Sequence, residues 1–316
     1  MANHHVHFPQ FQRWLLSIIP ALLVTACDGD RLQNPVDTSN HPASRIITLA
    51  PHLTELVYSA GAGSRLVGTV EYSDYPAAAL DLPRIGDAFR LDHEAIIGLK
   101  PDLILAWGSG TPRGVIDRLE QLNHRVVALK AGSLDGVADN IRTIGQLAGT
   151  EQDAEAAALA FEVSLDEIRV AAAGREPVTV FYQVSSQPLF TISRRHIIGE
   201  AIELCGGHNV FGKLLELSPS ISPEAVIDAA PEVIIATQYS DDASVENSFA
   251  VWRQWVSIPA VHDGNLFLID ANLMTRPSVR ILGGVLELCA RIAMAREKRA
   301  STAARPAPHA GLVYVQ

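Results

Sequence analysis

The sequence predicts an α/β protein with two Rossmann-like lobes of mostly parallel sheet, joined by a single long α-helix, with a ligand cleft between the lobes. The first observation is an internal repeat: the segment HEAIIGLKPDLILA at 93–106 recurs as PEAVIDAAPEVIIA at 223–236. Each copy reads as a short amphipathic helix, a proline with an acid, and an apolar strand. Strand-like and helix-like segments also alternate through both halves, and an Ala- and Glu-rich stretch without internal Pro or Gly lies between them. A repeat this widely spaced indicates a duplicated lobe.

Length and charge agree with this organisation. A chain of 316 residues is long for one core, which favours two domains. Lys and Arg number 25 against 35 Asp and Glu, a formal net charge of −10. This balance argues against a nucleic acid or an anionic lipid surface as a partner bound through charge.

The N-terminus has the pattern of an export signal. Arg13 precedes the apolar stretch 14–24, which is too short to span a bilayer, and small residues lead to Cys27. This resembles a bacterial lipoprotein signal, so residues 1–26 are predicted to be removed and Cys27 to be lipidated, with enough acyl chains for stable anchoring. Asp28 resembles the signal that retains such proteins on the inner membrane. The alternatives are an ordinary secretory signal with an incidental cysteine, or a buried helix.

The first lobe follows a polar, turn-rich tether at 27–44 and is predicted to occupy 45–149. Its expected strands lie at 45–49, 67–70 and 125–129 and in the first repeat copy. Its expected helices lie near 54–60, 113–122 and 134–147, besides the one in the repeat.

The linking helix is expected at 150–174, with Thr150 as N-cap and Gly174 as its stop. Such a connection allows only small rocking of the lobes. The second lobe is expected at 177–295, starting with a strand at 178–183 and ending in a helix. The polar segment 296–316 is predicted to be a disordered tail.

Two cysteines remain after Cys27. Cys205 and Cys289 both lie in the second half, in an export context where disulfides persist. We predict that they pair, the alternative being two buried free thiols.

Several motifs occur in an order that resembles one known family. They are Thr54-Glu-Leu, Tyr72-Ser-Asp-Tyr-Pro, Leu99-Lys-Pro-Asp-Leu-Ile-Leu-Ala-Trp, Pro188-Leu-Phe-Thr, Glu203-Leu-Cys-Gly-Gly-His-Asn-Val-Phe and Arg276-Pro-Ser-Val-Arg. Over about 45–292 the chain resembles the periplasmic cobalamin-binding proteins of ABC-type importers, within the class III solute-binding proteins whose lobes are joined by a helix. Close relatives in this class carry haem or iron–siderophores.

The resemblance implies a set of ligand contacts. Tyr72, Trp107 and Phe190 fall on positions where the family's aromatic side chains touch the corrin, and Arg276 matches an arginine that faces the cleft. Aromatic faces suit a large flat macrocycle, and a guanidinium fork suits amide or phosphate oxygens.

The match is incomplete at other family positions. Ala88 and Ser218 stand where the family reference has tryptophans, although Phe89 is one position away and is a candidate substitute. Asn272 replaces an aspartate and Leu273 a tryptophan. These departures leave the affinity and the particular corrinoid open.

His52 follows the first expected strand, at the sheet edge where open α/β folds bind ligands. A neutral imidazole there is a candidate axial ligand to the cobalt of a bound corrinoid. Alternatively, His52 caps a helix or lines the cleft without touching metal. The other histidines lack metal-ligand spacing, which argues against a receptor for free zinc or manganese.

The acids repeated in the two copies, Glu94 and Glu224, match the family's pair that docks on arginines of the membrane permease. Their position also suits a purely structural role, because Asp92 and Ser222 look like N-caps and an acid in the first turn favours the helix dipole. Both roles are compatible.

These inferences predict a monomeric solute-binding lipoprotein of the periplasm, anchored to the inner membrane, that captures cobalamin or a related corrinoid. It would deliver this cargo to an importer permease dimer with its ATPase. We expect no enzymatic activity, no nucleic-acid partner and no resident cofactor, since cobalamin is cargo. The alternatives are a haem or iron–siderophore receptor, with His52, Tyr58 or Tyr72 as haem ligand, and a tetrapyrrole metal chelatase-like enzyme.

Overall fold

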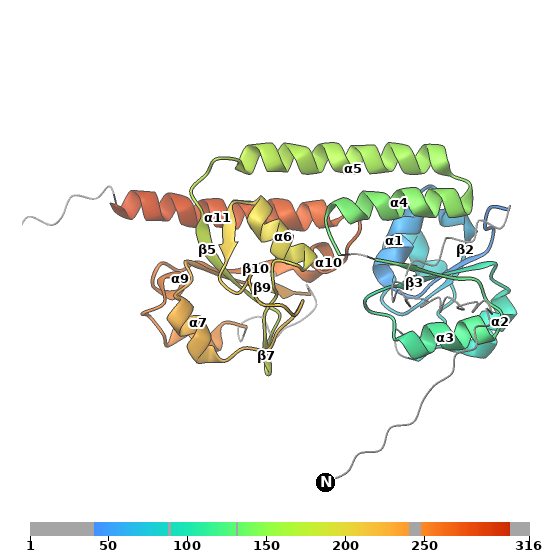
Figure 1. The fold of residues 1–316 in the computed structure, drawn as a ribbon, viewed down its shortest axis with the longest axis horizontal. Coiled ribbons are helices and arrows are strands. Elements are labelled where there is room, and N and C mark those ends of the chain that lie inside the picture. Colours follow the sequence, from blue (N-terminus) through green and yellow to red (C-terminus); the bar gives the residue numbers. More distant parts are fainter. Residues whose placement is uncertain (1–40, 88–89, 131, 240–247, 304–316) are drawn as a thin grey trace, which may run out of the picture. The chain divides into compact units, whose positions relative to one another are not determined.

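The computed structural model describes residues 41–87, 90–130, 132–239 and 248–303 (Figure 1). Within them lie two four-stranded sheets, in which every strand pairing is parallel, and one two-stranded antiparallel ribbon. Helices accompany both sheets, so the predicted α/β class is confirmed. The predicted signal peptide, Cys27, nearly all of the tether and Phe89 lie outside the described residues.

The N-terminal sheet has the strand order β2-β1-β3-β4. Its strands are β1 (Ile46–Thr48), β2 (Leu66–Thr69), β3 (Leu103–Trp107) and β4 (Val126–Leu129). The accompanying helices are α1 (Pro51–Ser59), η1 (Gly63–Arg65), η2 (Ala77–Asp81), α2 (His93–Leu99), α3 (Arg113–Gln121) and α4 (Asp135–Ala148). The central strands β1 and β3 are almost wholly buried, as expected for mostly apolar strands in the middle of a parallel sheet.

The C-terminal sheet has the order β10-β9-β5-β8. Its strands are β5 (Val178–Gln183), β8 (Gly207–Asn209), β9 (Val233–Gln238) and β10 (Leu266–Asp270), and the ribbon is β6 (Ser185–Ser186) with β7 (Leu189–Phe190). The helices are α6 (Ile197–Leu204), α7 (Pro223–Ala229), α8 (Ala250–Arg253), α9 (Pro259–His262), α10 (Ala271–Met274) and α11 (Ile281–Ala303).

The sequence repeat is also a structural repeat. Asp92 and Ser222 cap α2 and α7, their side chains accepting hydrogen bonds from the backbone N–H groups of Ala95 and Ala225. Both helices then end in a left-handed residue, with φ of 47° at one helix end and 43° at the other. A proline and a buried strand, β3 or β9, follow in each case. The N-caps expected from the sequence are therefore confirmed.

Helix α5 (Glu151–Ala172) connects the two lobes in the sequence and buries one stripe of apolar side chains. This stripe consists of Ala154, Ala158, Phe161, Leu165 and Ile168. It belongs to a single hydrophobic core that includes residues of both lobes. Thr150 is the N-cap residue of α5, as predicted, but its side chain does not bond the first turn: its hydroxyl donates a hydrogen bond to the Ala60 carbonyl at 2.6 Å.

The prediction of a disordered tail from residue 296 is wrong for its first part, because α11 continues to Ala303. Polar side chains of this last stretch bond the second lobe. Arg296 donates to the carbonyls of Glu176 and Gly206, and Arg299 donates to Glu232 at 2.8 Å. The polar composition suggested disorder, but the arginine side chains bind the end of α11 to the second lobe through hydrogen bonds.

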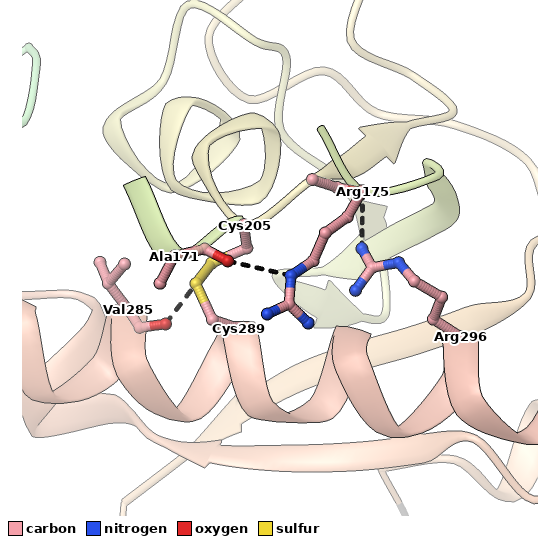
Figure 2. Close-up of a disulfide and its surroundings, with 7 residues drawn as sticks. Ala171, Arg175, Cys205, Val285, Cys289 and Arg296 are labelled. Carbon is pink, nitrogen blue, oxygen red and sulfur yellow. Dashed lines mark hydrogen bonds between the residues drawn. A yellow bond between two sulfur atoms is a disulfide. The ribbon is translucent and has the colours of Figure 1, made fainter. Parts of the chain in front are cut away.

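Cys205, at the end of α6, and Cys289, in α11, form a disulfide with Cα atoms 4.7 Å apart (Figure 2). The bridge joins segments separated by 84 residues. A cross-link over a loop of this size restricts the unfolded chain and typically stabilises a domain by about 2–4 kcal/mol. It ties α6 to α11 within the second lobe.

Candidate functional site

The candidate site lies where chain segments leave the carboxyl ends of the N-terminal strands. Helix α1, with His52 and Glu55, follows β1; the segment with Tyr72 follows β2; and Trp107 ends β3. Open parallel sheets bind ligands at this edge. The segment between α10 and α11, with Arg276, comes to the same place from the second lobe.

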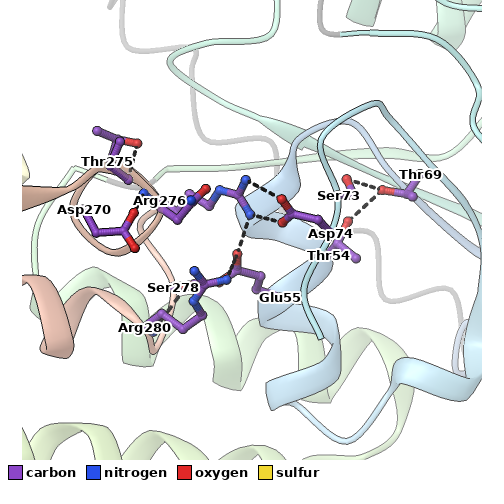
Figure 3. Close-up of polar contacts among 12 residues, drawn as sticks. Thr54, Glu55, Thr69, Ser73, Asp74, Asp270, Thr275, Arg276, Ser278 and Arg280 are labelled. Carbon is purple, nitrogen blue, oxygen red and sulfur yellow. Dashed lines mark hydrogen bonds and ion pairs between the residues drawn. The ribbon is translucent and has the colours of Figure 1, made fainter. Parts of the chain in front are cut away.

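Five residues form a polar joint between these segments: Glu55, Asp74, Arg276, Ser278 and Arg280 (Figure 3). The guanidinium of Arg276 donates to Glu55 Oε1 at 3.1 Å and also to both carboxylate oxygens of Asp74. The Ser278 hydroxyl donates to Glu55 Oε2, and Arg280 donates to Oε1 at 3.4 Å. Two carboxylates therefore face two guanidinium groups.

Burial sets the electrostatics of the polar joint. The side chain of Glu55 is 1% exposed, and burial raises its pKa although Ser278, Arg280 and Arg276 act in the opposite direction. Burial also works to raise the pKa of Asp74, but the hydrogen bond and charge of Arg276 outweigh it, so that pKa is lowered. For Arg276, burial works to lower the pKa, and the bonds to Asp74 and Glu55 raise it overall. Removing one partner of these ion pairs would leave a charged side chain without its counter-charge at a position that water reaches poorly.

Two tyrosines border the joint. Tyr75 lies beneath Arg280, with the guanidinium carbon 4.2 Å from the ring centroid, a cation–π contact. Tyr72 is 78% exposed and has φ of 64°, a left-handed conformation that non-glycine residues rarely adopt. Strained backbone of this kind is concentrated at binding sites. Tyr72 therefore presents a large aromatic face to solvent from an unusual, fixed backbone position.

His52 and Trp107 meet edge to face, with ring centroids 5.2 Å apart. His52 is 4% exposed, and burial together with the charge of Arg276 lowers its pKa to about 3. Its Nε2 and the Nε1 of Trp107 are buried, and neither has a hydrogen-bond partner among the residues that the structure describes. Ala50, not His52, is the N-cap of α1, so the helix-capping alternative is excluded. Because His52 is buried, a role in supporting the Trp107 ring is favoured over a role as a metal ligand.

Trp107 is half-buried and is held by its own turn. Its backbone N–H donates to the Thr111 hydroxyl at 3.0 Å, and its ring lies over Gly110, where a Cβ would come within 1.9 Å of a ring carbon. Only glycine leaves room for the ring at this point. The turn thus fixes one aromatic face beside the polar joint.

Phe190 comes from the other lobe, at the end of β7, and is half-buried. It pairs with Ser185 in the ribbon and bridges to Ser220. Ser218, at a family tryptophan position, donates its hydroxyl to the Thr191 carbonyl at 3.0 Å, while neighbouring Leu217 is 47% exposed. The structure thus brings His52, Trp107 and Arg276 together with Tyr72 nearby, and places Phe190 on the second lobe.

Glu94 and Glu224 are exposed second residues of α2 and α7. The pKa of Glu224 is lowered by its own backbone N–H and by the Ser222 hydroxyl. Their first-turn position fits the helix-start role, and docking stays a prediction.

Sequence reasoning missed most of the polar joint. Glu55, Asp74 and Ser278 each lie inside a motif that was recognised as a whole, yet no role was assigned to them. Arg280 was considered only as a cleft arginine for an anionic siderophore. The available signal was charge: a carboxylate inside an apolar helix start needs a cationic partner when buried.

Among the described residues, no group of three or more His, Cys, Asp or Glu side chains is arranged to hold a metal ion. In the same part of the chain, no helix combines the length and the apolar character needed to cross a bilayer.

Comparisons with known proteins agree with this geometry. Residues 46–273 match the model of a family described as periplasmic binding protein. A vitamin B12-binding protein of Vibrio campbellii is 34% identical over 262 residues, covering 83% of this chain and 94% of that protein. The crystal structure of the periplasmic vitamin B12-binding protein BtuF of Vibrio cholerae matches with a TM-score of 0.73 at 34% identity, covering 81% of this chain and 99% of that one. The periplasmic heme-binding protein RhuT of Roseiflexus sp. RS-1 shares the fold at 22% identity, with a TM-score of 0.71 and coverage of 80% and 99%. The chain belongs to the periplasmic binding protein family.

Proposed function

We propose that this chain is the solute-binding protein of an ABC importer and that it binds cobalamin, or a related corrinoid, between its two lobes. The observation that carries the proposal is the 34% identity to a vitamin B12-binding protein over 83% of the chain. The exposed ring of Tyr72 and the fixed ring of Trp107 supply the apolar faces that a flat macrocycle needs. Binding occurs without turnover and without a resident cofactor, and the protein acts as a monomer in the periplasm.

Within this proposal, Tyr72, Trp107 and Phe190 contact the corrin, with Phe89 as a further aromatic. Arg276 already bonds Glu55 and Asp74, so it serves the ligand mainly by setting the polar joint. We infer that His52 supports Trp107 and leaves cobalt uncoordinated, an inference supported by the burial of the residue, which is 4% exposed.

The first test is isothermal titration of residues 42–303 with cyanocobalamin, with haemin as competitor and a visible absorption scan of the complex. The fragment keeps all of α11, since its last turns bond the second lobe. One-to-one binding at sub-micromolar strength supports the proposal. Haemin binding with a Soret shift and no corrinoid binding would move the cargo to haem, and loss of that shift in Tyr72→Phe would identify the phenol as the iron ligand.

Tyr72→Ala and Trp107→Ala are each expected to weaken cyanocobalamin binding 10- to 100-fold, about 1.4–2.7 kcal/mol, because each removes a desolvated aromatic face. The matched control is Trp255→Ala, which removes a 40% exposed tryptophan between α8 and α9 and should leave Kd within twofold. Unchanged Kd values for both site variants would refute the assigned site.

The link to the membrane rests on two further features. We propose that Cys27 carries the lipid and that Glu94 and Glu224, at equivalent exposed positions of the two lobes, contact arginines of the permease. The Cys27→Ser chain should then fractionate as soluble protein, and Glu94→Ala with Glu224→Ala should reduce corrinoid uptake while leaving Kd unchanged. A membrane-bound Cys27→Ser product, or full uptake by the double variant, would contradict the respective assignment.

A further inference from the structure

A buried cluster of hydroxyl groups lies beside the polar joint and has no part in the contacts described so far. Thr48 ends β1, Thr54 lies in α1 and Thr69 ends β2; their hydroxyl oxygens are 2.7 to 2.9 Å apart. Thr69 also donates to the Ser73 hydroxyl at 2.7 Å. None of the four residues is more than 1% exposed. Hydroxyls removed from water need such partners, and their directional bonds tie three chain segments together.

The cluster is adjacent in sequence to both carboxylates of the polar joint. Thr54 immediately precedes Glu55, and Ser73 immediately precedes Asp74, as Figure 3 shows. Any shift of Thr54 against Ser73 would therefore displace the two acids relative to each other and to Arg276. The bond between Thr69 and Ser73 holds this spacing from the inside of the lobe.

The cluster also borders the strained position of Tyr72. On one side of Tyr72, the Glu71 N–H donates to the Gly86 carbonyl at 2.8 Å. On the other side, Ser73 accepts from Thr69 through its hydroxyl and from Arg84 through its carbonyl, the latter at 3.0 Å. A left-handed non-glycine residue persists only when its surroundings enforce that conformation. Here both neighbours of Tyr72 are tied down, and the ring between them is left exposed.

We propose that Ser73 is a positioning residue for ligand binding: its bond to the buried hydroxyl cluster holds the Tyr72 ring exposed and the Asp74 carboxylate on Arg276. The inference rests on the proposed function, in which Tyr72 contacts the ligand. Ser73, 1% exposed, acts through these two neighbours and not by touching the ligand.

The binding test compares Ser73→Ala with Thr150→Val in cyanocobalamin titrations. Thr150→Val removes one hydroxyl hydrogen bond from the N-terminal lobe, the 2.6 Å bond to the Ala60 carbonyl at the C-terminal end of α1, and leaves the four hydroxyls of the buried cluster in place. Ser73→Ala should raise Kd about tenfold, whereas Thr150→Val should leave it within twofold. Asparagine adopts the left-handed conformation readily and lacks the aromatic ring. In a Tyr72→Asn background, Ser73→Ala should therefore raise Kd by less than a further threefold. Equal effects of Ser73→Ala and Thr150→Val on Kd, or a full tenfold effect without the Tyr72 ring, would overturn the inference.

A second readout needs no ligand. With 3-fluorotyrosine incorporated, the ¹⁹F resonance of Tyr72 is assigned by its absence in Tyr72→Phe. Ser73→Ala should broaden or split this resonance and Thr150→Val should not; an unchanged resonance in Ser73→Ala overturns the inference. If the wild-type chain binds no corrinoid, the proposed function fails, yet the ¹⁹F comparison still decides the role of Ser73. Should Ser73→Ala not fold, Ser73→Cys, with a weaker acceptor, should show the same change to a smaller extent.

Discussion

Arg276→Ala is expected to lower the free energy of unfolding by about 3 kcal/mol, because it removes one partner of a buried ion pair and leaves the other charge behind. The side chains of Arg276 and Glu55 are 9% and 1% exposed. Ser278 and Arg280 would still bond Glu55, which places the loss at the lower end of the range for broken buried pairs. Urea denaturation at neutral pH measures the effect.

Arg280→Ala is the matched control. Its side chain is 17% exposed, and its guanidinium lies 3.4 Å from Glu55 and over the Tyr75 ring. A more solvated, longer contact with one cation–π partner should contribute about 1 kcal/mol. Equal losses in the two variants would refute the greater weight given to Arg276, and a loss below 1 kcal/mol for Arg276→Ala would show that the polar joint does not hold the two lobes together.

The repeated segments show what sequence can predict. Helix N-caps at Asp92 and Ser222, the prolines that follow α2 and α7, and the buried strands after them are local patterns whose physics acts within a few residues. The two-lobe fold follows from duplicating such a unit. The family motifs also pointed to Tyr72 and Trp107 as residues of the candidate site.

The polar joint could not be predicted in the same way. Arg276 and Glu55 are 221 residues apart in the chain, and nothing local selects one arginine as the partner of one glutamate. The left-handed conformation of Tyr72 is likewise imposed by its neighbours, since tyrosine itself does not favour it. The end of α11 was missed for a related reason: Arg296 and Arg299 are ordered by partners distant in sequence.

Acid should destabilise the protein through the buried imidazole of His52. Burial, assisted by the charge of Arg276, lowers the folded pKa from 6.5 to about 3. Between these values the unfolded chain binds a proton that the folded protein does not, so stability from this group is complete above pH 6.5 and is lost as the pH falls toward 3. The slope is about 1.4 kcal/mol per pH unit, or about 3 kcal/mol between pH 7 and pH 4.

The carboxylates of the polar joint titrate in the same range, so the measurement must isolate His52. The raised pKa of Glu55 makes acid stabilising for that group, whereas the lowered pKa of Asp74 makes acid destabilising. His52→Asn keeps both carboxylates and removes only the imidazole. The variant also loses the ring contact with Trp107, but the stability lost in this way is the same at both pH values, so it cancels when each protein is compared with itself. Urea denaturation at pH 7 and pH 4 should therefore show that the wild-type chain loses about 3 kcal/mol more than His52→Asn. Equal losses would mean that the imidazole becomes protonated in the folded state. A ring that protonates in place must reach water, and the same access would reopen coordination of a bound metal by His52.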